Sequence, residues 1–69
     1  MKVYAVKSLV FDGYVIKGLY LNELDAVMAM EKMVLEVPRE YDMQPVSLNH
    51  FASTWGGGPE FEIEEMEVV

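Results

Sequence analysis

The chain has 69 residues, no cysteine, a hydrophobic fraction of 52% and a formal net charge of −7, from twelve acidic and five basic side chains. This length fits a single domain, residues 1–69, and the lack of cysteine excludes disulfides and thiolate metal sites. No apolar run approaches the roughly 18 residues of a membrane span, and the acidic balance argues against direct nucleic-acid binding, which draws on Lys and Arg clusters.

The acidity has two interpretations. It can keep the protein soluble, or it can complement a basic groove that normally holds DNA or RNA. The opening stretch MKVYAVKSLVFDG does not predict a signal peptide, because Lys7, Asp12 and strand-like alternation interrupt it. We therefore expect a cytoplasmic protein with no membrane association.

Residues 2–21 predict a β-hairpin. Two runs rich in β-branched and aromatic residues, VYAVKSLVF and YVIKGLYL, flank Asp12-Gly13, a pair typical of two-residue type I′ turns. Gly18, inside the second run, predicts a β-bulge or the close approach of another group. The turn sets these cross-strand pairs: Phe11 with Tyr14, Val10 with Val15, Leu9 with Ile16, and Ala5 with Tyr20.

The stretch from Asn22 to Val37 predicts the helix of the chain. Asn22 is a good N-cap, because its side-chain oxygen can accept from a free backbone N–H of the first turn. Pro38 ends the helix, because its ring disfavours helical geometry at Val37. At about 100° per residue, the side chains expected to face the core gather on one side. They are Ala26, Val27, Met30, Met33, Val34 and Val37.

Leu24, Met28 and Leu35 form a second apolar ridge on this helix, separated from the first face by Glu31. A surface helix normally carries one apolar stripe, so the ridge should be covered either by the 38–59 segment or by another subunit. Small domains without disulfides often rely on oligomerisation. We favour a homodimer with these three residues in its interface.

Between Met43 and Pro59 the chain has no formal charge, taking His50 as neutral. Residues 46–53 predict a third strand, because apolar and small polar residues alternate there, while a short helix over 47–55 is the alternative. The glycines of 56–58 predict a loop.

Residues 60–69 alternate acidic and apolar side chains, which predicts a half-buried strand. The alternation shifts at Glu64-Glu65, as a β-bulge would require. Opposite charges on neighbouring strands attract, so Lys2 and Lys7 place this strand beside the first. The predicted fold is α+β: a small antiparallel sheet in β-β-α-β-β order, with one helix packed on one face.

No catalytic, metal or cofactor motif is recognisable. His50 is the only histidine, and Ser53 and Thr54 lie near it in sequence, but spacing alone does not assemble a nucleophile with an orienting group. One histidine without cysteine makes a poor metal site. The acidic 60–67 segment lacks the ligand pattern of an EF-hand, and Gly56-Gly57-Gly58 fits neither a Walker loop nor a dinucleotide fingerprint. We predict a protein without enzymatic activity, metal or cofactor.

The run from Asn49 to Trp55 combines aromatic, amide, imidazole and hydroxyl groups. Such a set suits a small-molecule pocket near His50, Trp55 and Gly56–Gly58, and it equally suits the core of an interface. A third interpretation is that Phe51 and Trp55 complete a small core. The interaction candidates are Asn49, His50, Phe51, Trp55, Glu62, Glu64 and Glu65.

Three stretches, MKVYAVKSLVFDGYVIKGLY, NELDAVMAMEKM and FEIEEMEV, resemble small accessory proteins encoded by bacteriophages. The resemblance implies a protein that binds and inhibits a host component in the host cytoplasm, and it assigns no functional residue. Segment 43–59 lies outside it. We therefore expect a homodimeric binding protein that contacts a host protein through its acidic surface and segment 43–59. The alternative is a protein that sequesters a small, nucleotide-like ligand.

Overall fold

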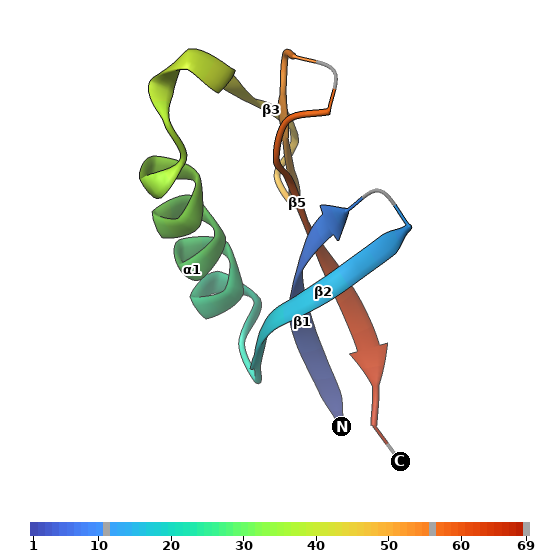
Figure 1. Cartoon of the computed structure of the whole chain (residues 1–69). Coiled ribbons are helices and arrows are strands. Elements are labelled where there is room, and N and C mark those ends of the chain that lie inside the picture. Colours follow the sequence, from blue (N-terminus) through green and yellow to red (C-terminus); the bar gives the residue numbers. More distant parts are fainter. Residues whose placement is uncertain (11, 56, 69) are drawn as a thin grey trace.

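A computed structural model describes residues 1–10, 12–55 and 57–68. One five-stranded sheet carries one α-helix (Figure 1). The elements in chain order are β1 (Lys2–Val10), β2 (Gly13–Tyr20), α1 (Glu23–Glu36), the short 3₁₀ helix η1 (Arg39–Tyr41), β3 (Met43–Ser47), β4 (His50–Ser53) and β5 (Glu60–Glu67). The sheet order is β2-β1-β5-β4-β3, and each pair of neighbours is antiparallel. The predicted α+β class is confirmed. No helix in the described ranges is long and apolar enough to cross a membrane.

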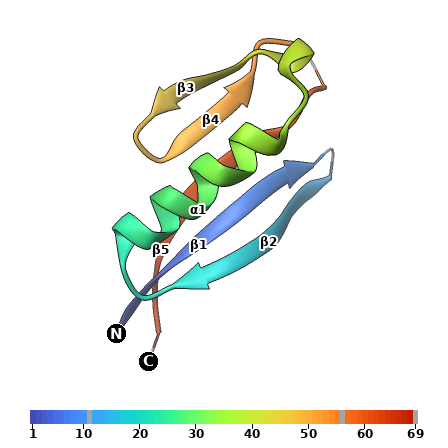
Figure 2. The same cartoon turned by 90° about the vertical axis from the view of Figure 1, so that its left-hand side faces the viewer.

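Helix α1 begins and ends where the sequence predicts. The side chain of Asn22 accepts a hydrogen bond from the backbone N–H of Leu24 at 2.8 Å, and Val37 closes the helix before Pro38. The predicted inner face of α1 packs across β1 and β5 (Figure 2). Ala26 and Met30 are fully buried there against three sheet residues, which are Val6, Phe61 and Ile63.

The predicted register of the hairpin is wrong. Tyr14 pairs with Leu9, and Gly13 pairs with Val10 as the first residue of β2. Gly13 has a φ of 150°, a conformation that residues with side chains rarely adopt. The glycine is therefore needed at the strand entrance, and each predicted pair near the turn is displaced by two positions. Phe11, the predicted partner of Tyr14, lies outside the described residues.

The bulge predicted at Gly18 is present. The register shifts between Val6 and Lys7, so that Lys17 is an additional residue of β2 between Ile16 and Gly18. A Cβ atom on Gly18 would lie 2.8 Å from the hydroxyl oxygen of Tyr20. Both reasons for a glycine in this strand, a bulge and a close approach, therefore apply.

The single strand predicted over 46–53 is two strands, β3 and β4, joined at Leu48 and Asn49. The alternation of Val46 and Leu48 predicts one extended strand, but both side chains are exposed near the turn of the β3–β4 hairpin. The element order otherwise follows the predicted β-β-α-β-β. The helix offered as the alternative for 47–55 is absent from the described residues of that range.

Strand β5 lies beside β1, as the charges predict, but it has no bulge at Glu64-Glu65. The pairing of β1 with β5 is regular from Lys2–Glu67 to Ser8–Phe61. Glu65 lies on the helix side of the sheet opposite Tyr4 and is exposed there, so an acidic side chain reaches water at this position without a bulge.

Candidate binding surface

Among the described residues, no helix or strand packs over one side of the sheet. We call it the open face: the side turned away from α1 (Figure 1). Cross-strand pairs share a face, and Val6–Ile63 marks the helix side. The pairing therefore assigns these residues to the open face: Val3, Ala5, Lys7, Leu9, Tyr14, Ile16, Leu19, Gln44, Ser47, His50, Ala52, Glu60, Glu62, Glu64 and Met66.

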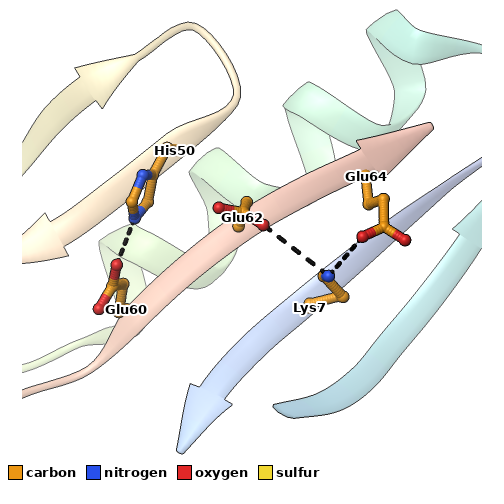
Figure 3. A network of polar contacts seen from close by, with 5 residues as sticks. All are labelled: Lys7, His50, Glu60, Glu62 and Glu64. Carbon is orange, nitrogen blue, oxygen red and sulfur yellow. Dashed lines mark hydrogen bonds and ion pairs between the residues drawn. The ribbon is translucent and has the colours of Figure 1, made fainter. Parts of the chain in front are cut away.

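Lys7 is the centre of the open face (Figure 3). Its Nζ lies 2.8 Å from Glu64 Oε1 and 3.8 Å from Glu62 Oε1, and 4.4 Å from the ring centroid of Tyr14. Only 7% of Lys7 is exposed. The side chains around it, and not a second layer of secondary structure, bury it among the described residues. A charged group is buried at little cost only when it is paired, and the carboxylate of Glu64 supplies the hydrogen-bonded partner of the Lys7 ammonium.

The acidic neighbours of Lys7 favour its charged form. The hydrogen bond to Glu64 raises the pKa of the Lys7 ammonium, and the negative charges of Glu64 and Glu62 act in the same direction against partial desolvation. On the helix side, desolvation together with the nearby carboxylate of Glu65 raises the pKa of the Tyr4 phenol, whose oxygen is 3.3 Å from that carboxylate. Both groups therefore hold their protons through the physiological pH range.

His50 and Glu60 form a further polar contact of the open face, between the imidazole Nε2 and the Glu60 carboxylate (Figure 3). The hydroxyls near His50 in sequence are directed elsewhere. Ser53 Oγ donates to the backbone carbonyl of Tyr41 at 2.7 Å. Thr54 Oγ1 lies 3.4 Å from an Asp42 carboxylate oxygen. These hydroxyls contact the end of η1 and the residue after it, and neither makes a hydrogen bond to the imidazole.

The half of the open face nearest β2 is apolar. Tyr14, Ile16 and Leu19 are 55%, 44% and 61% exposed. With the half-buried Val3 and Leu9 of β1, they border the acidic row of β5, which consists of Glu60, Glu62 and Glu64. Antiparallel sheets usually present polar side chains on an uncovered face, so these three exposed side chains are the unusual feature of the surface.

The predicted interaction residues do not form one site. His50, Glu62 and Glu64 lie together on the open face. Phe51 packs against the core on the helix side. Glu65 also lies on the helix side, beside Tyr4. Asn49 lies at the tip of the β3–β4 hairpin and its carbonyl accepts from the N–H of Ile63 at 2.8 Å, while Trp55 is exposed in the loop that follows β4.

The pocket predicted near His50, Trp55 and the glycines is not assembled among the described residues. A shallow hollow of about 270 Å³ does lie by the glycine loop, but its lining consists of Leu9, Val10, Gly57, Gly58 and Glu60. Gly58 is itself packed closely against Ser53 and Tyr41. Gly56 lies outside the described residues.

The second ridge of α1 is uncovered. Leu24, Met28 and Leu35 are all exposed, and the 38–59 segment does not bury them. Leu35 lines a hollow of about 390 Å³ with residues of the helix end, the η1 turn and the start of β3. The sequence leaves two elements to cover this ridge, the 38–59 segment and another subunit. In the described structure the 38–59 segment does not cover it.

Sequence reasoning missed the residues that give the open face its character, which are Lys7, Tyr14, Ile16, Leu19 and Glu60. A signal for Glu60 was present, because Glu60, Glu62 and Glu64 alternate with Phe61 and Ile63. The misplaced turn displaces the partners by two positions and so keeps Tyr14 and Ile16 on the face of Leu9. The predicted pairing of Ala5 with Tyr20 is wrong, because the bulge at Lys17 brings Leu19 opposite Ala5 and so moves it to the open face.

Comparisons of the chain with protein-family models, with characterised proteins and with solved structures find no match. The case for a function therefore rests on the surface described above.

Proposed function

We propose that this protein is a non-enzymatic binding module that holds a basic protein partner against its open face. The observation that carries the proposal is a sheet surface without a covering layer, on which exposed apolar side chains of β2 border an acidic row on β5. An apolar patch with a polar rim is the usual composition of a protein interface.

The charge pattern favours a basic partner. Glu60, Glu62 and Glu64 stand at alternate positions of β5, and among the described residues the strand pairing assigns one lysine, Lys7, to the open face. The net charge of the whole chain is −7. Complementary charge speeds association and selects the partner more than it adds affinity, so the apolar half of the face must supply most of the binding energy.

The uncharged segment 43–59 extends this surface. Strand β4 pairs with β5 and places His50 and Ala52 on the open face, and β3 adds Gln44 and Ser47. These small and polar side chains extend the open face from the acidic row of β5 to the β3 edge. In keeping with the resemblance to phage accessory proteins, we take the partner to be a host protein of the cytoplasm.

The test is a comparison of two charge-matched variants in a capture experiment. The open-face variant is Glu60→Gln/Glu62→Gln/Glu64→Gln, and the control is Glu23→Gln/Glu31→Gln/Glu36→Gln on α1, where all three residues are exposed. Each removes three negative charges. Captured host proteins are identified by mass spectrometry, after circular dichroism has shown that both variants are folded.

We expect a protein that is retained by the wild type and by the α1 variant and is lost with the open-face variant. Rising salt should release it, because exposed ion pairs are screened. Equal retention by both variants, or no protein enriched by the wild type, would contradict the proposal.

A further inference from the structure

We propose that two copies of this chain associate through their β2 edges, forming a continuous sheet across a twofold axis. The inference is independent of the proposed partner, which would meet the open face. The two edge strands of the sheet, β2 and β3, differ in how well they are protected against pairing with another strand (Figure 2).

The β3 edge is better protected than the Gly13–Ile16 part of the β2 edge. An edge strand presents unpaired backbone donors and acceptors, and proteins blunt it with proline, bulges and short length. Strand β3 has five residues, contains Pro45 and has a register irregularity before Ser47. Strand β2 has eight residues and no proline, and its bulge at Lys17 leaves Gly13–Ile16 regular.

The charge distribution favours a second copy at this edge. From Gly13 to Leu21 the only charged side chain is Lys17, although the chain carries a net charge of −7. The acidic residues are concentrated on α1 and β5 instead. Two copies that met through either of those elements would bring like charges together, whereas two β2 edges would not.

The sequence of β2 is self-complementary in one antiparallel register. With Val15 opposite its own copy, Tyr14 lies opposite Ile16 of the second copy, and Lys17 lies opposite Gly13. Tyr14 and Ile16 share the open face, so an aromatic side chain would meet a β-branched one twice, a favourable cross-strand pair. The one charged residue of the strand would meet a glycine. A twofold interface requires this kind of self-complementarity.

The exposed area of the chain also fits an interface. A compact monomer of 7.9 kDa is expected to expose about 4,400 Å², and this chain exposes 5006 Å². The excess is roughly 600 Å², somewhat less than the about 800 Å² that each partner contributes to a standard-size interface. The chain is elongated, with extents of 40 × 25 × 18 Å.

The experiment measures the mass of the full chain in solution by sedimentation equilibrium at increasing protein concentration. We expect the wild type to approach twice 7.9 kDa. Val15→Lys should return it to the monomer mass, because the two new charges would face each other across the axis. Leu24→Lys, on the exposed ridge of α1, should leave the dimer intact. A monomeric wild type overturns the proposal, and so does a dimer that is separated by Leu24→Lys and not by Val15→Lys.

A second measurement is available if Val15→Lys does not fold. Amide hydrogen exchange of the wild type is followed at low and high protein concentration, and slower exchange within residues 13–17 at high concentration is the expected result. Unchanged exchange in this stretch contradicts the proposal. Loss of host-protein capture by the open-face variant is unaffected by either outcome, so the two proposals fail separately.

Discussion

Lys7 joins the two halves of the open face. Its stem lies between the apolar side chains of β2 and the acidic row of β5, and its ammonium contacts Glu64, Glu62 and the ring of Tyr14. Long lysine stems often cover apolar surface while the charged head remains near water. Lys7 therefore fixes the arrangement of the side chains that the proposed partner would meet.

Replacement of Lys7 by Met should destabilise the fold by about 1.5–2 kcal/mol, the lower end of the roughly 1.5–3 kcal/mol that a hydrogen bond to a charged group contributes. The loss stays at this low end because Glu62 and Glu64 keep contact with water. Thermal unfolding measures the change. Lys17→Met is the matched control, since Lys17 is exposed, and its effect should remain within roughly 0.5 kcal/mol. Equal effects of the two substitutions would show that the Lys7 contacts contribute nothing.

The raised pKa of Lys7 gives a stability change at alkaline pH. A group whose pKa is higher in the folded state contributes fully below its unfolded pKa, and the contribution is lost as pH rises through the folded pKa. The stability difference between wild type and Lys7→Met should therefore be constant near neutrality and shrink above the ordinary lysine pKa of 10.5. Tyr4 acts in the same direction in both proteins and cancels. Denaturant unfolding from pH 7 to 11 measures this difference; a constant difference throughout would be evidence against the assigned cause.

The helix is the element that the sequence predicted best. Its start and end depend on contacts within a few residues, at Asn22 and Pro38, and its inner face follows from a spacing that needs no knowledge of the sheet. Its second ridge was also identified correctly as apolar surplus, but its cover depends on segments far away in the chain.

Asn22→Ala should destabilise the protein by about 1 kcal/mol, because the N–H of Leu24 loses its side-chain acceptor. Asn22→Asp preserves an acceptor at the cap and should remain close to the wild type. Thermal unfolding of both variants measures the effect. A loss of equal size in the Asp variant would mean that the cap hydrogen bond is not its source.

The sheet was predicted in outline only. The neighbourhood of β1 and β5 followed from charge, but the register of the hairpin did not, because Asp12-Gly13 can enter a turn in more than one way. Strands β3 and β4 were merged because Leu48 continues the alternation across their turn. The expected bulge in β5 is absent: Glu65 lies on the helix side opposite Tyr4, where its side chain is exposed and still reaches water. The open face depends on all three registers, so sequence patterns could not assemble it.

At the scale of the whole molecule, the helix covers one face of the sheet, and no described helix or strand packs over the other (Figure 1). The fully buried apolar set among the described residues is small, with Met30 and Val6 its largest members. A domain of this size has little stability to spare. The large apolar side chains exposed on the open face and along the β2 edge are the surface on which both proposals rest.

Site-specific photocrosslinking tests the role of the open face most directly. A photoreactive residue replaces Leu19 on the open face or Leu24 on α1, two leucines that are 61% and 64% exposed in different layers. In a host lysate, position 19 should give a covalent adduct with a basic protein, and position 24 should not. An adduct of that protein formed equally from both positions, or only from position 24, would contradict the account.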